Sequence, residues 1–323
     1  MIRPVSFDFN PETSLTNPMQ RAGTTNPAMT DPATSNPGTT TPATTSAAAA
    51  QGEFDRLAQA LRSEGISVCV AADTPRPPKP DAVFPNNWVS FHEDGTVVLY
   101  PMFAMSRRVE RRQEVIDTVV EKLGFTVTRV VDLTHHEREG RALEGTGSLV
   151  LDHVNRVAYA SISPRTNARV IEEWSRELGY EPVVFEAFDR NRVPVYHTNV
   201  LLSVGERAAV VGSAAIADHD RGRVLERLRA GGREVIEIGQ EEMERFVCNM
   251  LEIASWDEAL GDYRVMVMSV AARVALSPAA YERLSGCTDA MLAVPVPTIE
   301  RLGGGSVRCM LAEVFLPTKP ARD

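Results

Sequence analysis

The sequence has neither a basic stretch nor a long apolar run. Its 323 residues include 34 Lys and Arg against 43 Asp and Glu, and the net charge of -9 is spread along the chain. A basic stripe usually marks a nucleic-acid or anionic-membrane partner, so we expect neither. The most apolar stretch, residues 265–280, is interrupted by Arg273 and Pro278. It cannot supply the roughly 18 uncharged apolar residues that a membrane span needs.

Cysteine is also scarce. Cys69, Cys248, Cys287 and Cys309 lie far apart, with no C-x-x-C pair and no His-rich segment near them. This spacing argues against a disulfide framework and against a zinc site, so we expect free thiols and neither a metal nor an organic cofactor. The N-terminal residues MIRPVSFDFN lack the apolar core of a signal peptide. Together these absences predict a soluble cytoplasmic protein, with a homo-oligomer left open.

Residues 21–52 differ in composition from the rest of the chain. They hold nine Thr, eight Ala and four Pro, with only Arg21 and Asp31 charged. The prolines recur every five residues, at 27, 32, 37 and 42. This spacing forbids a continuous helix, and the segment offers almost nothing to a core. We predict a disordered insertion within a single catalytic domain that spans residues 1–323.

Outside the insertion, a strand, a tight polar turn, a second strand and a helix recur. Clear copies begin near residues 84, 147 and 199, and looser copies begin near 248 and 308. Helical spacing of apolar residues marks the helices, as it does at residues 54–61 directly after the insertion. Residues 66–72 predict a strand, and an N-terminal strand over residues 2–9 is expected to complete the last copy.

Repeats of about 50–60 residues are typical of solenoids and propellers. A chain whose last unit needs its first strand closes more easily into a ring than into an open array. The pattern therefore predicts an α/β ring of five units. In such a ring, we expect the catalytic groups at the inner ends of the strands.

Five short segments near the unit starts could carry chemistry. An acid, an imidazole and a thiol stand in three of them: Glu144, His197 and Cys309. A thiol nucleophile needs a nearby His or cation to ionise it and an acid–base group for the leaving group. Wide separation in sequence is no objection, because catalytic triads assemble in space. The segments are DAVFPNNW (81–88), LEGTGS (143–148), YHTN (196–199), FVCNMLE (246–252) and GGGSVRC (303–309).

The residues alone leave the role of Cys309 open. The preceding Gly-rich stretch, residues 303–306, can bring backbone N–H groups close to a substrate, as oxyanion stabilisation requires. An inert core thiol is the competing interpretation, and it fits the other three cysteines. The pair His135-His136 lies in the charged stretch THHERE and is expected to be solvated.

The motifs DAVFPNNW, LEGTGS, SPRTN, HTN, CNMLE and GGGSVRCMLAEVFLP, taken in this order, resemble the citrulline hydrolase (citrullinase) family. The resemblance extends from residue 3 to the C-terminus and omits only residues 21–52. This family is grouped with arginine deiminase and dimethylarginine dimethylaminohydrolase in the guanidino-group-modifying superfamily. The resemblance implies a five-bladed α/β propeller with a central active site. It also implies a nucleophile at Cys309, a general acid/base at His197 and a carboxylate partner at Glu144.

Four positions depart from the deiminases and methylarginine hydrolases of that superfamily. Where those enzymes carry carboxylates around a cationic guanidinium, this sequence has Asn86, Asn87, Gly147 and Asn199. A buried cation without a counter-charge is costly. Carboxamides both donate and accept hydrogen bonds, which suits a neutral ureido group. The departures therefore favour citrulline over arginine as the substrate.

The resemblance also implies contacts to the amino-acid end of the substrate. Arg107 and Arg165 match arginines that bind the α-carboxylate, a role for which the planar guanidinium is well shaped. Asp81 matches an acid near the α-amino group. From the residues alone, Arg165 could instead cap a helix and Arg107 could lie on an exposed face. Asn17 and Asn249 are expected to be structural.

The sequence therefore predicts hydrolysis of the ureido group of L-citrulline to ornithine, ammonia and carbon dioxide through a covalent adduct on Cys309. The alternative is arginine deiminase or dimethylarginine dimethylaminohydrolase-like activity on a guanidino substrate. A non-catalytic binding protein on the same fold is less favoured, because Glu144, His197 and Cys309 are all present.

Overall fold

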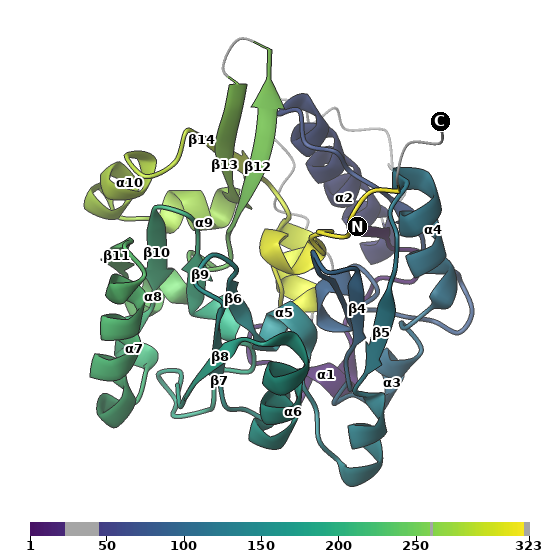
Figure 1. Cartoon of the computed structure of the whole chain (residues 1–323), viewed down its shortest axis with the longest axis horizontal. Coiled ribbons are helices and arrows are strands. Elements are labelled where there is room, and N and C mark those ends of the chain that lie inside the picture. The colour runs from purple at the N-terminus through teal and green to yellow at the C-terminus, as the bar shows by residue number, and fades with distance from the viewer. Residues whose placement is uncertain (23–44, 259–260, 320–323) are drawn as a thin grey trace, which may run out of the picture.

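The computed structural model describes residues 1–22, 45–258 and 261–319 (Figure 1). Within these residues, four three-stranded sheets and one two-stranded sheet surround the C-terminal segment, which is drawn in yellow. The predicted ring of five α/β units is confirmed. No helix in the described ranges has the length and apolar content required to cross a membrane.

The four larger units share one topology. In the first, β3 (Val89–Phe91) pairs antiparallel with β4 (Thr96–Leu99), helix α4 (Gln113–Leu123) follows, and β5 (Arg129–Asp132) pairs parallel with β4. The sequence pattern predicted the two strands and the helix but not the third strand. The second unit consists of β6 (Val150–Asp152), β7 (Val157–Ser161), α6 (Ala168–Leu178) and β8 (Glu181–Phe185). The third consists of β9 (Leu202–Val204), β10 (Ala208–Val211), α7 (Asp218–Ala230) and β11 (Glu234–Glu237). The fourth consists of β12 (Leu251–Asp257), β13 (Gly261–Ser269), α10 (Pro278–Ser285) and β14 (Ala290–Val294).

The fifth unit is smaller than predicted. Strand β1 (Ile2–Arg3) pairs parallel with β2 (Ala71–Ala72), which is all that remains of the strand predicted over residues 66–72. Pro4 lacks the N–H group that would extend this ladder. The predicted pairing of the N-terminal strand with residues near 308 is wrong, because Val307–Met310 form a short 3-10 turn, η7.

Helix α2 (Ser46–Ser63) begins inside the segment predicted to be disordered. The side chain of Thr45 accepts a hydrogen bond from the N–H of Ala48, and this N-cap is followed by a run of alanines, the best helix formers. The predicted insertion therefore extends too far at its C-terminal end. At its other end, the N–H of Arg21 bonds to the carbonyl of Arg301. The remaining part of the predicted insertion, residues 23–44, lies outside the described residues.

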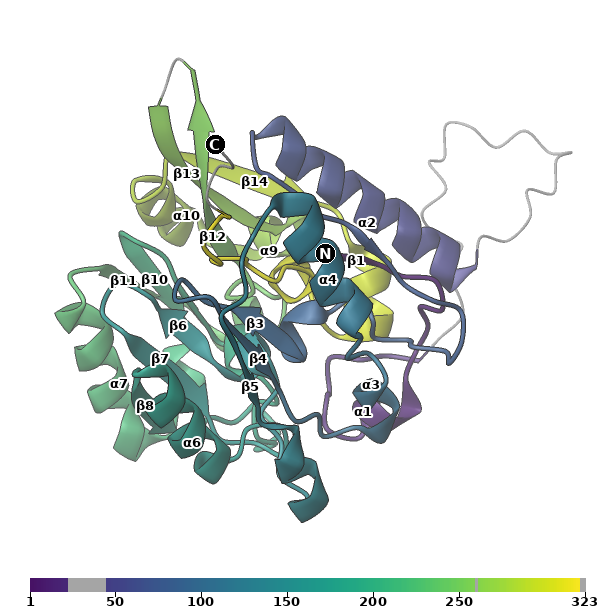
Figure 2. The same ribbon diagram turned by 45° about the vertical axis from the view of Figure 1, so that its right-hand side comes forward.

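The helices pack their apolar faces against the outer sides of the sheets (Figure 2). Helix α6, for example, buries Val170, Ile171, Trp174 and Leu178, which follow helical spacing. Trp174 also donates a hydrogen bond from its indole N–H to the hydroxyl of Tyr100, at 2.9 Å. Large side chains buried in this way each stabilise the fold by about 1.5–3 kcal/mol. This packing holds the inner strands in place.

Short helical turns stand directly before the inner strands. Turn η2 (Pro85–Asn87) precedes β3, α5 (Gly145–Ser148) precedes β6, and η4 (Thr198–Val200) precedes β9. All of these turns therefore lie at the same end of the ring. The remaining short elements are α1 (Pro11–Ser14), α3 (Met105–Arg108), η3 (Thr134–Glu139), η5 (Ser213–Ala215), α8 (Gln240–Met243), α9 (Val270–Ala275) and the π-helix η6 (Ile299–Gly303).

Candidate active site

The turns before the inner strands collect the residues that the sequence singled out. Each of the nine predicted catalytic or substrate-binding residues is buried, and they form one connected region at this end of the ring. They are Asp81, Asn86, Asn87, Arg107, Glu144, Arg165, His197, Asn199 and Cys309.

Two glycines allow α5 to approach η2 closely. Gly145 has a φ of +47°, and a Cβ there would stand 2.1 Å from the carbonyl oxygen of Asn86. At Gly147, a Cβ would stand 2.5 Å from Nδ2 of Asn87 and 2.9 Å from Nδ1 of His197. The GTG sequence is therefore required by the contact between the two turns. It places Glu144 beside the carboxamide of Asn87 and the imidazole of His197.

Glu144 is the electrostatic centre of the site. Its Oε2 lies 2.8 Å from Nε2 of His197 and 3.5 Å from Nη1 of Arg165, and its Oε1 accepts a hydrogen bond from the N–H of Phe103. Burial alone would raise the pKa of this carboxyl. The charge of Arg165, the hydrogen bond with His197 and the charge of Arg107 outweigh burial and lower the pKa to about 2. Glu144 is therefore ionised at neutral pH.

His197 is neutral in the resting site. Burial lowers its pKa to about 4, although Glu144 acts in the opposite direction. Because an ionised carboxylate can only accept, Nε2 carries the ring proton and donates it to Glu144. Nδ1 is then the basic nitrogen. It lies beside Gly147, and the His197 ring lines the substrate cavity.

The Cys309 thiol lies between two carboxamides. Nδ2 of Asn249 is 3.3 Å from Sγ, and Nδ2 of Asn199 is 3.7 Å from it. Burial raises the pKa of Cys309, and the hydrogen bond from Asn249 is the largest effect in the opposite direction. Sequence reasoning assigned Asn249 a structural role. The sequence signal that could have identified it is a polar Asn inside the apolar segment FVCNMLE. In the structure, this side chain is fully buried.

Arg107 is fully buried, so the exposed position considered for it is wrong. Its guanidinium bonds to both carboxylate oxygens of Glu110, at 2.9 and 2.8 Å, and to Oδ1 of Asn87, at 2.8 Å. Glu110 was not predicted, although it stands three residues after Arg107 in the same short helical region. The interactions of Arg107 fix the carboxamide of Asn87, so its Nδ2 faces the catalytic groups.

A small cavity of about 20 Å³ remains between these groups. Segment Asn10–Gln20 covers it: Asn10 and Thr13 donate hydrogen bonds to Asp81, and Asn17 and Gln20 donate to carbonyls of residues 302–304. Arg165 donates to the carbonyl of Thr13 and to the hydroxyl of Thr16. This cover was not predicted from the sequence. The cavity is lined by Thr13, Asn17, Asp81, Phe84, Asn87, Arg107, Arg165, Tyr196, His197, Gly303, Gly304, Gly305 and Cys309.

Two of the predicted substrate-binding residues stand outside this lining. Asn86 lies behind Asn87 and accepts a hydrogen bond from it at 3.1 Å. Asn199 contacts Cys309 from the far side and lines a second, larger cavity. Both are therefore placed to support the groups that face the substrate cavity.

A second group of titratable residues lies away from this cavity. His135, His136 and Glu173 bring potential metal-ligand atoms within 4.8 Å of one another. Nε2 of His136 is 2.8 Å from the Glu173 carboxylate. The expectation that His136 is solvated is wrong, because this contact with α6 draws its ring below the surface.

A family model described as "N,N dimethylarginine dimethylhydrolase, eukaryotic" matches residues 3–316. A search of curated proteins gave no match. The match covers the whole ring and all of the groups described above.

Solved structures share the fold at low sequence identity. ArgZ, an arginine dihydrolase from the ornithine-ammonia cycle in cyanobacteria, superimposes with a TM-score of 0.69 at 18% identity, over 99% of this chain and 41% of that chain. The chain thus spans about two fifths of full-length ArgZ, but 98% of its isolated N-terminal domain. A dimethylarginine dimethylaminohydrolase with an S-methyl-L-thiocitrulline adduct gives a TM-score of 0.56 at 18% identity, over 82% of this chain and 88% of that chain. These similarities confirm the five-bladed α/β propeller.

Proposed function

The chain belongs to the eukaryotic N,N-dimethylarginine dimethylhydrolase family, and from this premise we propose that it hydrolyses the terminal carbon–nitrogen bonds of a guanidino amino acid such as arginine. Members of this family are hydrolases of carbon–nitrogen bonds other than peptide bonds. Structures of similar fold include an AgrE variant in complex with L-arginine and an ArgZ domain bound to its substrate. These relatives support the guanidino alternative better than the citrulline substrate predicted first.

The observation that carries the proposal is the balance of charge around the cavity. The ion pair of Arg107 and Glu110 is satisfied within the protein. An α-amino acid would place its ammonium at Asp81 and its carboxylate at Arg165, both of which line the cavity. Glu144 then shares its two counter-charges with other anions, because Arg107 is paired with Glu110 and Arg165 would be paired with the substrate carboxylate. A guanidinium would supply the further positive charge.

In the proposed reaction, Sγ of Cys309 attacks the guanidino carbon and the carbon–sulfur bond forms. As this bond forms, the proton of the Cys309 thiol passes to Nδ1 of His197. His197 then gives that proton to the departing nitrogen, which leaves as ammonia when its carbon–nitrogen bond breaks. Nδ1 of His197 then takes a proton from water, whose oxygen attacks the same carbon and releases the thiol. One turnover converts a guanidino group and water into a ureido group and ammonia. A second turnover would give ornithine, ammonia and carbon dioxide.

Citrulline is the second candidate, and the environment of Gly147 favours it. A carboxylate cannot stand at this position, because its Cβ would overlap the carboxamide of Asn87. The group beside the reacting carbon is therefore an amide, which matches the mixed donor and acceptor character of a ureido group.

An amine-release assay on arginine, dimethylarginine and citrulline tests both candidates. We expect release from arginine, no turnover by Cys309→Ala, and a decrease of about 10²–10⁴-fold in Glu144→Gln, the usual contribution of acid–base catalysis. Turnover of citrulline alone would transfer the assignment to the second candidate. Absence of turnover on all three substrates would overturn the proposal.

A further inference from the structure

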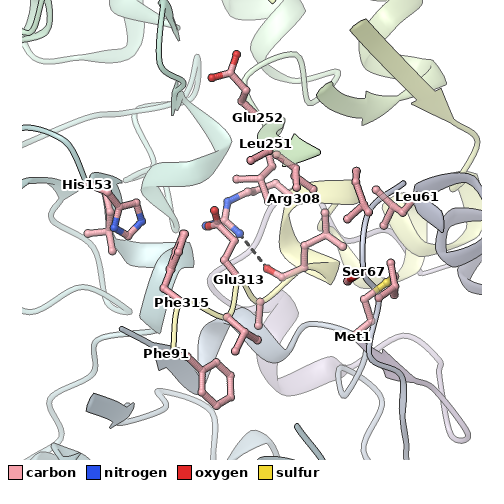
Figure 3. A pocket seen from close by; sticks show the side chains of 18 of the residues that line it. Met1, Leu61, Ser67, Phe91, His153, Leu251, Glu252, Arg308, Glu313 and Phe315 are labelled. Atoms are coloured by element: carbon pink, nitrogen blue, oxygen red, sulfur yellow. Dashed lines mark hydrogen bonds and ion pairs between the residues drawn. The ribbon is translucent and has the colours of Figure 1, made fainter. Parts of the chain in front are cut away.

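A large cavity lies at the opposite end of the inner strands from the catalytic groups (Figure 3). Its volume is about 830 Å³, well within the range of cavities that bind small molecules. Pro85 and Asn199 of the active-site turns reach its inner wall, and the residues at the other ends of the inner strands, such as Phe91, His153 and Glu206, line the rest. We call it the rear cavity. It shares no lining residue with the substrate cavity.

The walls of the rear cavity are mainly apolar. Leu61, Phe91, Leu251 and Phe315 come from four different parts of the chain and surround its centre (Figure 3). The free energy falls when an apolar group displaces water from an apolar cavity of this size. A ligand for this space therefore has a substantial apolar part.

One of the ion pairs within these walls joins Arg308 and Glu313. The guanidinium of Arg308 and the carboxylate of Glu313 lie side by side near the centre of the view (Figure 3). Their single contact, from Nη2 to Oε2, is 3.3 Å long, and Nη1 of Arg308 donates to the carbonyl of Leu311. Within the described part of the chain, Nε of Arg308 has no partner. Both charged groups therefore keep hydrogen-bonding capacity for a ligand.

The other charged groups of the rear cavity are engaged more closely. Arg233 forms two bonds to Asp152, at 2.6 and 2.7 Å, and Arg264 bonds to Glu206 at 2.7 Å. Oε2 of Glu252 accepts a hydrogen bond of 2.6 Å from the backbone N–H of Glu206, whereas its buried Oε1 has no partner among the described residues, and no cation is paired with it there. The loosely held pair is thus the one between Arg308 and Glu313, and it offers one positive and one negative group next to each other.

We propose that the rear cavity binds an α-amino acid with an apolar side chain. The carboxylate of such a ligand matches the guanidinium of Arg308, its ammonium matches the carboxylate of Glu313, and its side chain fills the apolar space. The carboxylate and the ammonium of an α-amino acid lie next to each other, as the guanidinium of Arg308 and the carboxylate of Glu313 do. A simple apolar carboxylate or an apolar amine satisfies only one of the two groups. The site does not depend on the proposed catalytic function.

Isothermal titration calorimetry with L-norleucine on the full chain tests this site. We expect saturable binding that Glu313→Gln weakens roughly tenfold or more, the usual effect of losing a charged hydrogen-bond partner. Glu206→Gln is the matched control, because it makes the same change in the same cavity at a carboxylate already paired with Arg264, and it should leave the affinity within about twofold. Hexanoate and pentylamine lack one charge each and should bind roughly tenfold more weakly than norleucine.

Three results would overturn the proposal. One is the absence of saturable norleucine binding to a folded protein. Another is equal binding of hexanoate or pentylamine, which would show that only one charge is recognised. The third is binding that Glu313→Gln leaves intact but Arg165→Lys abolishes, since this would locate the amino acid in the substrate cavity. Circular dichroism of each variant confirms that it is folded.

Discussion

At the scale of single residues, the absence of a side chain at position 147 determines which groups can face the substrate. The space that a Cβ would occupy there is taken by Nδ2 of Asn87 and the ring of His197. A carboxylate side chain at position 147, as in the deiminase pattern described above, is therefore excluded by Asn87 and His197. Restoring it would require Asn87 to change as well.

We expect Gly147→Ala to lower kcat by about 10²-fold, because the new methyl group displaces His197 or Asn87 from its catalytic position. Steady-state kinetics with a folded-state check by circular dichroism measures this. Gly222→Ala is the control: Gly222 lies in helix α7 with open space around it, so the change should preserve kcat and stabilise the fold by about 0.5–1 kcal/mol. Full activity in Gly147→Ala would contradict the packing described here.

Asn249 offers a second test at this scale. Removing its N–H, which lies 3.3 Å from Sγ, takes away the strongest local stabilisation of the Cys309 thiolate. We therefore expect Asn249→Ala to raise the pKa of Cys309 further and to slow its alkylation by iodoacetamide at neutral pH. The exposed Asn191→Ala should leave the alkylation profile against pH unchanged. An identical profile in Asn249→Ala would assign this residue to packing alone.

The candidate site was largely predictable from single residues, because a thiol, an imidazole and a carboxylate in three repeated motifs have few other uses. Asn249 and Glu110 were not predictable in the same way. Each acts on another side chain, Cys309 or Arg107, and such a contact exists only once the turns are assembled. A buried Asn or Glu looks structural until its neighbour is known.

At the scale of elements, segment Asn10–Gln20 controls access to the site. A cavity of about 20 Å³ holds little more than a water molecule, so an amino acid enters only when this segment moves. Its closed position depends on side-chain contacts to the main chain at residues 302–304 and on the contacts of Asp81 and Arg165.

Asn17→Ala removes the bond to the carbonyl of Gly304 and should weaken closure over bound substrate. Because one hydrogen bond contributes about 0.5–1.5 kcal/mol, we expect KM to rise about two- to tenfold with a smaller change in kcat. Steady-state kinetics provides both values. Ser14→Ala, in the same segment, loses only a local bond to Pro11 and serves as the control. Equal effects of the two variants would refute a specific role for Asn17.

The elements were predicted unevenly. Strong helical spacing identified α4 and α6, and tight polar turns identified the first two strands of each unit. The third strands are partly exposed, as in β5, where Val130 is solvent-accessible, so they lack the alternation that marks a strand. The N-terminal strand was paired with the wrong partner because sequence spacing does not specify which edge closes a ring.

At the scale of the whole molecule, buried titratable groups make the fold sensitive to acid. Burial lowers the pKa values of His197 and His92 to about 4, below the ordinary value of 6.5. Protonation then favours the unfolded chain, so stability falls as the pH decreases from about 6.5 toward 4. Glu144, whose pKa is lowered to about 2, contributes stability above its ordinary value of 4.5, which is lost below that pH.

We therefore predict that the free energy of unfolding decreases between pH 6.5 and 4.5 by up to about 1.4 kcal/mol per pH unit for each buried histidine. Urea unfolding at several pH values measures this slope. His92→Gln should reduce the slope, whereas the exposed His219→Gln should not. A free energy that stays constant over this range would show that neither histidine is neutral in the fold.

The fold as a whole was predictable because six motifs in a fixed order specify one ring. The choice of substrate could not be predicted in this way, because substrate preference depends on the net charge within the cavity rather than on which motifs are present. Counting lost carboxylates at Asn86, Asn87, Gly147 and Asn199 favoured citrulline, but that count omitted the charge of Glu144, which shares Arg107 with Glu110 in the folded site.

The order of the active-site groups along the chain has a consequence for protein synthesis. The residues that cover the cavity, such as Asn10 and Asn17, emerge first from the ribosome, and the thiol of Cys309 emerges after every other catalytic group. Glu144 and His197 belong to turns that precede β6 and β9, so both are translated before the nucleophile. A nascent chain therefore has no assembled centre with which to react, and chemistry begins only when the ring has been completed around its last turn.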